Sequence, residues 1–245
     1  MKLNEYLTIV IPCKNEKGII LKTLDLLNYQ ADIHNVKVVV CDASNDGITN
    51  HDLLNRLDYD QKDMFDLHLT DGGLPSIARN NGFKLVTTPY VLFMDADVFL
   101  LDPKVLIRSV IKIKKYNLDL VTTKFRSDNG NYNYVYKVFD LIQLLSKWST
   151  PFCLGGYMLV RSETFKSIGG FDEKIKVAED YMFSKQIKPK KFGRINNIVY
   201  TPPRRFENKG VMYMLRLMLS SFFNNNNKEY FTNDKGYWKW KSGEQ

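Results

Sequence analysis

The 245-residue sequence predicts an α/β domain in which helices flank a mixed, mostly parallel sheet. Two observations support this fold class. Short runs rich in β-branched and aromatic residues alternate with segments whose apolar residues recur at helical spacing, which is the pattern of βαβ units. Polar residues directly follow three of the strand-like runs, as expected where ligands bind at the carboxyl ends of parallel strands.

The first half of the chain supplies most of the predicted parallel sheet. Its predicted strands are apolar and rich in β-branched residues, and they comprise residues 7–12, 36–41, 65–69 and 90–94. Its predicted helices comprise residues 20–27, 52–57 and 76–86. We expect Asn15 to cap the first of these helices, because an asparagine side chain can accept a hydrogen bond from an unpaired amide at a helix N-terminus.

The second half is less regular, and we expect it to complete the same single domain, which spans residues 1–223. Its predicted strands comprise residues 118–123 and 154–161, the second entered through Gly155 and Gly156. Its predicted helices comprise residues 105–115, 135–148 and 180–188. Residues 224–245 are rich in Asn and Lys, so we expect a loosely held polar tail that Trp238 and Trp240 pin to the domain.

Composition limits the class of protein and of partner. Hydrophobic residues make up 44% of the chain, enough for a substantial core, and the formal net charge is +8. That charge suits a polyanionic partner, or it reflects only a solvated basic surface. The three cysteines are far apart in sequence without C-x-x-C spacing, so we expect a reducing compartment and no disulfide. No secretory signal and no apolar run of ~20 residues is visible, so we expect a cytoplasmic protein.

Polar residues after the strands define one candidate site. Asp95 and Asp97 flank an alanine directly after a predicted strand, and two such carboxylates can hold Mg²⁺ or Mn²⁺, which commonly takes further ligands from substrate phosphates. Asp42 ends a second strand, where it can accept hydrogen bonds from a base or a ribose hydroxyl. Asp46 in the same turn is at least as well explained by local turn hydrogen bonds. Arg79 can donate a forked pair of hydrogen bonds to a diphosphate, or it can simply face the solvent.

Further segments join these clusters into a longer pattern. In chain order the set comprises residues 8–16 (TIVIPCKNE), 39–46 (VVCDASND), 78–82 (ARNNG), 90–97 (YVLFMDAD), 155–156 (GG), 167–173 (SIGGFDE) and 178–181 (AEDY). Their order and spacing resemble those of the family 2 glycosyltransferases of the GT-A fold, which are inverting enzymes. The resemblance extends over most of the chain. It implies a Rossmann-like sheet, a nucleoside-diphosphate sugar as donor, and Mn²⁺ or Mg²⁺ as cofactor.

The resemblance also assigns residues to the donor side of the site. It implies that Asp97 ligates the metal and that Asp95 contacts the nucleotide sugar, and we expect Asp95 to be a second metal ligand. The residues placed around the nucleotide sugar by the resemblance or by their own chemistry are Pro12, Asn15, Glu16, Asp42, Arg79, Asp95, Gly155, Gly156, Arg204 and Arg205.

On the acceptor side, the resemblance implies that Asp180 is the general base and Glu179 its acidic neighbour. A hydroxyl is a poor nucleophile until a base takes its proton, so one carboxylate must lie beside the acceptor. Capping of the helix N-terminus is the structural alternative for this acidic pair. Residues 200–206 (YTPPRRF) resemble a subgroup with paired arginines after the base, which implies that Arg204 or Arg205 contacts the diphosphate.

The sequence departs from the family pattern at two places. Cys41 and Ala43 stand where relatives usually have an acid and a glycine. Many relatives have a later histidine that completes the metal shell, whereas the three histidines of this chain all precede Asp95. We therefore expect the metal to have fewer protein ligands, with an arginine supplying positive charge instead.

The acceptor side includes two apolar segments. We expect residues 125–148 to form part of the acceptor wall, although the apolar face of the helix over 135–148 is better explained by core packing. Residues 211–223 are strongly apolar around Arg216 and, at 13 residues, too short to span a bilayer. We expect an amphipathic helix here, which suits a membrane interface or packing against the sheet or a partner subunit about equally. A peripheral membrane protein with a glycan or lipid-linked acceptor is the resulting hypothesis.

Three other functions fit parts of the pattern. A nucleotidyltransferase acting on sugar phosphates would also combine such a sheet with a metal, but it usually has a Gly-rich loop after the first strand, and this chain has none there. A nucleic-acid-binding module should concentrate its basic residues, whereas here they are scattered, so we expect no nucleic-acid partner. An inactive binding protein is the third alternative, and retention of Asp97 and Asp180 argues against it.

Overall fold

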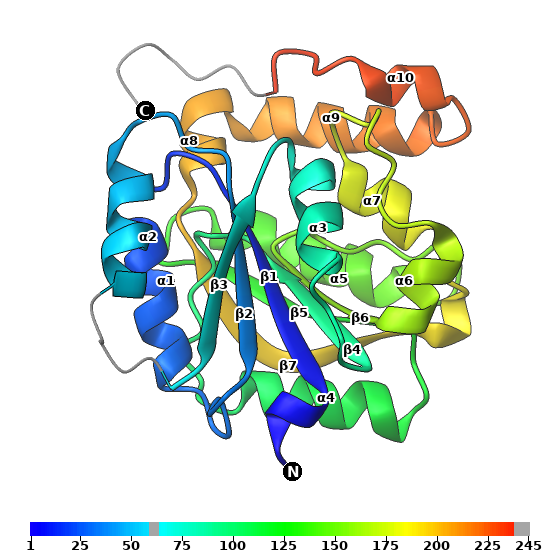
Figure 1. Ribbon diagram of the computed structural model, residues 1–245. Coiled ribbons are helices and arrows are strands. Elements are labelled where there is room, and N and C mark those ends of the chain that lie inside the picture. The colour runs from blue at the N-terminus through cyan, green and yellow to red at the C-terminus, as the bar shows by residue number, and fades with distance from the viewer. Residues whose placement is uncertain (59–63, 238–245) are drawn as a thin grey trace.

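The computed structural model describes residues 1–58 and 64–237 and contains a seven-stranded sheet between layers of helices (Figure 1). The strands are β1 (Leu7–Cys13), β2 (Lys37–Asp42), β3 (Asp66–Asp71), β4 (Tyr90–Met94), β5 (Leu120–Ser127), β6 (Tyr157–Arg161) and β7 (Phe192–Thr201). They lie in the order β3-β2-β1-β4-β6-β5-β7. Every pairing is parallel except those of β6 with β4 and β5. The prediction of a mixed, mostly parallel α/β sheet is therefore confirmed.

Helices cover both faces of this sheet. They are η1 (Leu3–Glu5), α1 (Ile19–Asn28), α2 (Ile48–Asp58), α3 (Pro75–Phe83), α4 (Val105–Lys115), α5 (Asn133–Ser146), α6 (Ser162–Ile168), α7 (Glu179–Ser184), η2 (Pro189–Lys191), α8 (Arg204–Lys209), α9 (Val211–Phe223) and α10 (Lys228–Thr232). One core joins one sheet face to α1, α4 and α5 through residues such as Leu24 and Val110. The other joins the opposite face to α3, α6 and α7 through Phe165 and Phe183. All three cysteines are buried and free, as predicted.

The local sequence pattern predicts most of the helices and strands. It does not predict those in which apolar residues fail to recur at the spacing of a helix or a strand. Predictions 90–94, 105–115 and 211–223 coincide with β4, α4 and α9. The helix expected over residues 180–188 ends at Ser184 instead. Beyond it the backbone hydrogen bonds join residues three apart, from the Gln186 amide to Phe183 and from the Ile187 amide to Ser184, and Pro189 follows. Strand β7 was not predicted, because the polar pair Asn196 and Asn197 interrupts its apolar pattern at an irregular pairing with β5.

The prediction that Asn15 caps the first helix is wrong. Asn15 has a φ of 54°, in the left-handed region, and α1 begins only after Gly18. The amide N of Asn15 donates to Ser44 Oγ over 2.8 Å, and its Nδ2 donates to Asn45 Oδ1 over 2.9 Å. Asn15 therefore joins the loop after β1 to the loop after β2, which a reading of one segment at a time could not reveal.

The expectation of a loosely held tail after α9 is also wrong over the described part of that segment. Helix α10 begins at Lys228, and the Phe231 side chain on it is 0% exposed. Phe231 packs in a separate small core with Ile175 and Val177. Trp238 and Trp240, which we expected to pin the tail, lie outside the described residues.

Helix α3 approaches the sheet closely at Gly82. A Cβ atom at this position would lie 2.3 Å from Val10 Cγ1 and 2.7 Å from Cys41 Sγ, far inside normal contact distance. Only glycine allows α3 to lie this close to β1 and β2. The same helix carries Arg79, so this contact fixes how deeply that side chain reaches into the molecule.

We expect Gly82→Ala to destabilise the protein. Alanine in a helix normally stabilises by up to ~1 kcal/mol relative to glycine, but overpacking against Val10 and Cys41 should cost about 1–3 kcal/mol and should win. Urea unfolding measures the difference. The double variant Val10→Ala/Gly82→Ala is the control, because removing the Val10 methyl groups makes room and should recover part of the loss. A neutral or stabilising Gly82→Ala would contradict this account of the packing.

Candidate active site

Five charged residues from four separate segments meet at the edge of the sheet where β1 and β4 end. Glu16 follows β1, Asp95 and Asp97 follow β4, Asp180 lies on α7, and Arg204 begins α8. Helices α7 and α8 both lie at this edge (Figure 1). Parallel strands end at one edge, so the clusters after β1 and β4 come together as predicted, and they meet the two later segments there.

The Arg79 side chain joins the two halves of this site. Its Nη2 donates to Asp95 Oδ1 and its Nη1 donates to Glu179 Oε1, each over 2.8 Å. Arg79 is 1% exposed, so its alternative interpretation as a solvent-facing residue is wrong. A buried guanidinium needs compensating charge, and the two carboxylates supply it. The predicted contact with a diphosphate remains a prediction.

Gly155 and Gly156 allow the chain to pass beside this cluster. A Cβ at Gly155 would lie 3.1 Å from Arg79 Nη2 and 3.2 Å from Asp180 Oδ2. A Cβ at Gly156 would lie 3.0 Å from the ring of Phe125. The absence of side chains here leaves the backbone of Gly155 free to bond the cluster. Its amide donates to Asp180 Oδ2 over 2.7 Å, and its carbonyl accepts from Arg79 over 3.4 Å.

The surroundings of Asp180 make its carboxyl group easier to protonate than an ordinary aspartate. Burial raises the pKa of its carboxyl to about 7, assisted by the nearby Glu179 carboxylate. The charge of Arg79 and the hydrogen bonds from the amides of Tyr181 and Gly155 act in the opposite direction. A carboxylate with such a pKa can accept a proton near neutral pH, which suits a general base.

Arg204 neutralises the other side of the site. Its Nη2 donates to Asp97 Oδ2 over 2.6 Å and to Glu16 Oε1 over 2.9 Å. The second oxygen of Glu16, Oε2, is buried and has no hydrogen-bond partner among the described residues. Burial raises the pKa of Glu16 to about 7, and the carboxylate of Asp97 adds to this effect while Arg204 opposes it. A second cation beside Glu16 and Asp97 would satisfy that orphaned oxygen.

The donor set around Asp97 fits a hard divalent cation that takes most of its ligands from a substrate. Among the described residues, no group of three or more His, Cys, Asp or Glu side chains could hold a metal by itself. Asp97 offers a carboxylate that is 21% exposed. Glu16 bonds the same arginine through Oε1, and its Oε2 has no partner among the described residues. Mg²⁺ and Mn²⁺ are commonly held by one or two carboxylates together with phosphates. The chemistry fits, provided that Arg204 moves.

The residues expected at the nucleotide line the loops after β1 and β2. Pro12 pairs with Cys41 and Cys13 with Asp42 in the register of these strands. Asp42 Oδ1 accepts hydrogen bonds from the amide and the hydroxyl of Ser44, and its Oδ2 accepts from Asn50 over 3.3 Å. The role of Asp42 at a base or ribose remains a prediction. A nucleotide would have to compete with Ser44 and Asn50 for the Asp42 carboxylate.

Asp46, in the same turn, makes local hydrogen bonds. Its Oδ1 accepts a hydrogen bond from the Thr49 amide over 2.9 Å, and its Oδ2 accepts from the Thr49 hydroxyl over 2.7 Å. These bonds satisfy free donors at the N-terminus of α2. The local interpretation of Asp46 is confirmed.

Tyr237 also lies near this site, although its sequence context did not predict it. The Tyr237 ring lies beneath Arg205, whose Cζ is 4.0 Å from the ring centroid. Burial raises the pKa of the Tyr237 phenol; Arg205 opposes the shift, and the carboxylates of Glu179, Asp180 and Asp95 add to it. Tyr237 lies in a polar segment without periodicity, so no local signal in the sequence identifies it.

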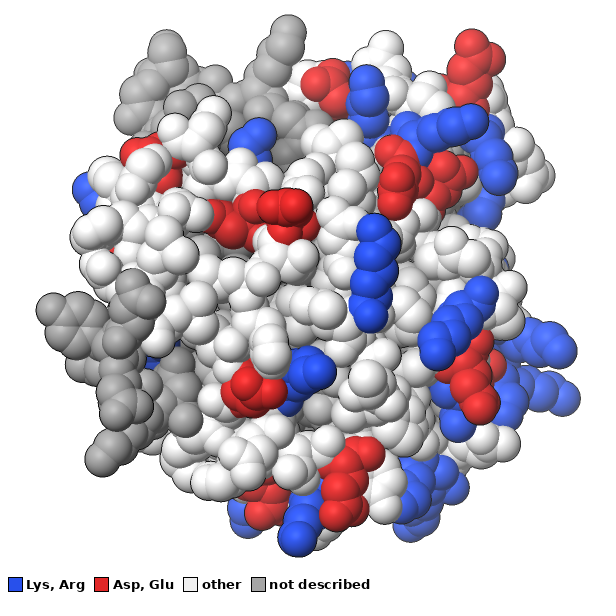
Figure 2. All heavy atoms as spheres, viewed as in Figure 1, with Lys and Arg blue, Asp and Glu red and all other residues white. Residues whose placement is uncertain are grey.

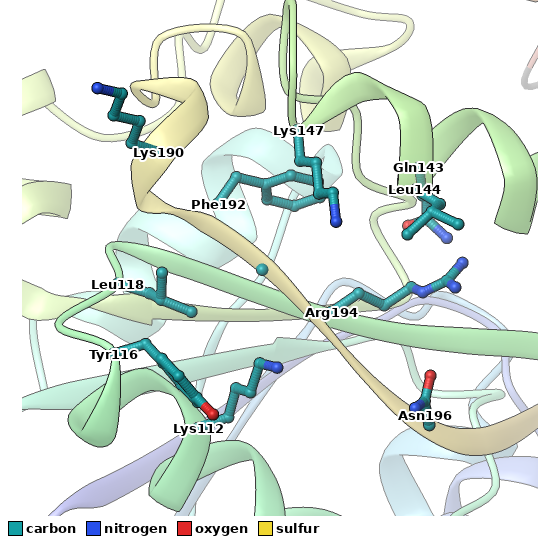
Figure 3. Close-up of a pocket in the computed structure, with 11 residues that line it drawn as sticks. Lys112, Tyr116, Leu118, Gln143, Leu144, Lys147, Lys190, Phe192, Arg194 and Asn196 are labelled. Atoms are coloured by element: carbon teal, nitrogen blue, oxygen red, sulfur yellow. The ribbon is translucent and has the colours of Figure 1, made fainter.

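A basic groove of about 360 Å³ lies elsewhere, between α4, α5 and β7 (Figure 3). Its described lining contains four cationic residues and no acidic one: Lys112, Lys147, Lys190 and Arg194. Lys112 lies in the last turn of α4 and Lys147 is the residue that caps the end of α5. Cations at these positions offset the negative ends of the two helices, which explains them without a ligand. None of the predicted site residues lines this groove.

Comparison with known proteins identifies a family. The family model described as glycosyl transferase family 2 matches residues 8–169. The poly(ribitol-phosphate) beta-glucosyltransferase of Bacillus spizizenii is 25% identical over 222 residues, which cover 82% of this chain and 35% of that protein. The chain therefore spans about a third of the length of this relative.

Solved structures share the fold. The mannosyltransferase PcManGT from Pyrobaculum calidifontis, in complex with GDP-Man and Mn²⁺, has a TM-score of 0.70 at 18% identity and covers 90% of this chain and 64% of its own. Residues 1–349 of S. aureus TarS, in complex with UDP-GlcNAc, have a TM-score of 0.61 at 17% identity. The match covers 95% of this chain and 69% of the TarS chain. At these identities the likeness shows a common fold.

We expect Arg79→Lys to destabilise the protein by about 3 kcal/mol, at the lower end for a broken buried ion pair, because Asp95 is partly exposed. An ammonium is a single point charge and cannot bond both carboxylates as the guanidinium fork does. Urea unfolding at pH 7 measures the loss. Arg108→Lys is the control, because Arg108 is 51% exposed and pairs only with Asp102. A loss below ~1 kcal/mol, the range of surface pairs, would show that Arg79 is not the joint between the two halves.

Proposed function

Because the chain belongs to glycosyltransferase family 2, we propose that it is an inverting enzyme that transfers a sugar from a nucleoside-diphosphate sugar to a hydroxyl acceptor. One observation carries the proposal. Arg79 bonds both Asp95 and Glu179, and their near neighbours Asp97 and Asp180 therefore belong to the same site. A cation-binding carboxylate and a proton acceptor on two sides of one cleft are what inversion requires.

Asp180 acts as the general base in this proposal. The acceptor oxygen forms a bond to the anomeric carbon while the bond from that carbon to the diphosphate oxygen breaks. Asp180 takes the proton of the acceptor hydroxyl, and the nucleoside diphosphate leaves with the electron pair. Glu179, bonded to Arg79, holds the start of α7 in place and keeps a second negative charge beside Asp180, which strengthens its affinity for the proton.

The departing diphosphate gains negative charge, so the opposite side of the cleft must be positive. When bound, a divalent cation beside Asp97, with Asp95 and Glu16 around it, would supply Lewis-acid stabilisation of that charge. Arg204 leaves Asp97 in this state and pairs with a phosphate oxygen through its guanidinium fork. Arg205 lies next to it on α8, and the paired arginines thus complete the positive side of the site. Mn²⁺ in the complexes of structural neighbours supports the choice of metal.

The nucleotide lies over the loops after β1 and β2 in this proposal. Pro12 and Asn15 line the pocket, and Asp42 accepts hydrogen bonds from the base or the ribose after exchanging its local partners. Structural neighbours in complex with UDP-GlcNAc and GDP-Man support a nucleoside-diphosphate donor. The acceptor is a hydroxyl of a glycan, polyol or lipid-linked chain. The similarity to the poly(ribitol-phosphate) beta-glucosyltransferase of Bacillus spizizenii supports this class.

Helix α9 supports a peripheral membrane association. No helix among residues 1–58 and 64–237 is long and apolar enough to cross a bilayer. One face of α9 packs on the core through Met214 and Met218. Residues on the opposite face, at helical spacing, are exposed: Met212 (62%), Leu219 (52%) and Phe223 (80%), with Arg216 among them. An apolar stripe with a cation on a basic protein suits the surface of an anionic membrane.

A nucleic-acid partner is not part of this proposal. Lys and Arg side chains on the face shown in Figure 2 alternate with acidic ones and do not form a continuous stripe. Binding the phosphate backbone of a nucleic acid would require Lys and Arg side chains to cluster on one surface.

We expect Asp180→Asn to lower kcat by about 10²-fold or more, the usual scale of general-base catalysis, while donor binding stays nearly intact. A thermal-shift screen of nucleotide sugars first identifies the donor, because saturating donor should stabilise the protein by roughly 3 kcal/mol. Asp172→Asn is the matched control, since Asp172 lies in the loop before α7, accepts from the Lys174 amide, and has a long ion pair of 3.8 Å with Lys228. Near-normal turnover of Asp180→Asn would remove Asp180 from this role.

The pH dependence provides a further prediction. Asp180 must be deprotonated to accept a proton, and its surroundings raise its pKa to about 7. Activity should therefore be low at acid pH and rise through a midpoint near pH 7 in kcat/KM, which reports groups of the free enzyme. An unperturbed aspartate would place that midpoint near pH ~4. An acid limb at pH ~4 would therefore show that Asp180 is not the titrating base.

We expect Arg204→Gln to raise the affinity for Mn²⁺ at least tenfold in the absence of donor, because it removes the cation that occupies Asp97. Asp97→Asn should lower the same affinity at least tenfold. Free Mn²⁺ measured by electron paramagnetic resonance gives both values without an activity assay. Arg205→Gln is the control, an equal loss of charge on the same helix. Equal Mn²⁺ affinity in all variants would show that Asp97 is not the metal ligand.

Sedimentation with vesicles tests the membrane association. The wild-type chain should sediment with phosphatidylglycerol-containing vesicles and lose this property in 0.5 M salt, because electrostatic attraction to anionic lipid is screened. Phe223→Ser should lower the bound fraction several-fold. Tyr29→Ser is the control, because Tyr29 is 75% exposed and lies on a different helix end. No sedimentation of the wild-type chain would contradict the association.

A further inference from the structure

Residues 228–237, here called the C-terminal strap, pack directly on the loop that carries the proposed base. Phe231 of the strap is fully buried in a small core with Ile175, Val177 and Met182. The backbone joins the same two segments, because the Lys176 amide donates to the Phe231 carbonyl over 2.9 Å. The strap thus contacts the chain immediately before α7 through both side-chain and backbone interactions.

The far end of the strap is tied to the helices that follow the paired arginines. Lys209 Nζ donates to the Gly236 carbonyl over 2.9 Å, and the Tyr213 hydroxyl donates to the Lys235 carbonyl over 3.2 Å. The Tyr237 amide donates to the Asp234 carbonyl over 2.7 Å, which closes a turn. The strap therefore links the loop before α7 to helices α8 and α9.

Tyr237 lies where the two sides of the site approach each other. Its ring stacks beneath the Arg205 guanidinium, with 4.0 Å between Cζ and the ring centroid, and packs against the same small core as Phe231. The small core also contains Val177, Ala178 and Met182, which flank Glu179 and Asp180 in sequence, so the end of the strap lies beside the segment that carries the proposed base. Burial raises the pKa of the Tyr237 phenol, and the charges of Glu179, Asp180 and Asp95 add to this effect.

Helix α7 is poorly equipped to position the base without such support. It is only six residues long, and isolated helices shorter than about 12 residues are marginal in water. The residue before it, Ala178, has a φ of 55°, a left-handed conformation that costs a non-glycine residue of order 1–3 kcal/mol. The tertiary contacts that hold Ala178 in this conformation come in part from the strap, because Ala178 packs against the small core.

We propose that the C-terminal strap is a functional part of the site: it fixes the Glu179–Asp180 segment from outside, and Tyr237 forms the wall that keeps water from the base on the acceptor side. Tyr237 and Phe231 are positioning residues, and Tyr237 shapes the acceptor subsite, which accepts a hydroxylated ligand. This inference rests on the proposed function for its catalytic consequence. Its structural consequence does not depend on that function.

Hydrogen exchange tests the structural consequence without an activity assay. In Phe231→Leu, which keeps most of the buried volume, the Lys176 amide should exchange at least tenfold faster, while amides of β1 and β4 keep their protection. Phe223→Leu is the control, since Phe223 is 80% exposed on α9. Phe231→Ala is a stronger variant, and its β1 protection shows whether the domain still folds. Unchanged exchange at Lys176 in Phe231→Leu would overturn the proposed support.

Hydrolysis of the donor tests the role of Tyr237. The probe is whichever of UDP-glucose, UDP-GlcNAc and GDP-mannose most raises the melting temperature of the wild-type chain, and release of nucleoside diphosphate into water is measured without acceptor. Tyr237→Ala should raise this rate at least fivefold at unchanged donor affinity, whereas Tyr237→Phe, which keeps the ring, should match the wild type. The variant Tyr237→Ala/Asp180→Asn should lose the increase, because water then lacks its base.

The outcomes separate the two proposals. If none of the three donors raises the melting temperature, the proposed function fails, and the exchange at Lys176 still decides whether the strap supports the loop. If a donor binds and Tyr237→Ala leaves hydrolysis unchanged or slower, Tyr237 is not a wall against water. An increase that persists in the double variant would likewise overturn the assignment, because Asp180 would then not be the group that Tyr237 shields.

Discussion

The arrangement of the site depends on one buried cation, Arg79. A guanidinium that is 1% exposed cannot remain unpaired, and the structure satisfies it with Asp95 from the sheet edge and Glu179 from α7. These two ion pairs fix the distance between the turn of Asp95 and Asp97 and the helix that carries Asp180. Gly82 allows the helix of Arg79 to lie against the sheet, and Gly155 leaves room for its guanidinium. Small residues therefore set the geometry that the charges then hold.

The donor side is balanced by charge before any ligand binds. Arg204 bonds both Glu16 and Asp97, so two carboxylates that would repel each other share one cation. The chain lacks the late histidine of many relatives, and the positive charge of Arg204 partly neutralises the turn of Asp95 and Asp97 instead. In the proposed mechanism a metal at Asp97 takes the place of Arg204, which bonds Oδ2 of that carboxylate. Entry of a metal with its diphosphate would exchange one cation for another at nearly constant charge, which limits the electrostatic cost.

The acceptor side is held by contacts from outside the family's usual motifs. The proposed base begins a six-residue helix behind a left-handed Ala178, a local structure that local interactions do not stabilise. Phe231 and Tyr237, close to the end of the described chain, supply the missing packing. Ion pairs hold the donor side, whereas the acceptor side needs apolar packing in addition to the ion pair between Arg79 and Glu179.

The pattern of residues along the chain was enough to predict the α/β fold class and the edge of the sheet that carries the site. Both follow from local patterns, since β4 is a continuous buried run and Asp95 must lie where it ends. Which charges pair, in contrast, follows from how the chain folds. Arg79 bonds residues 16 and 100 positions away, and Arg204 bonds Asp97 across 107 positions. Neither these pairs nor the packing of Phe231 leaves a local pattern, because periodicity reports which face a residue occupies and not which distant residue it meets.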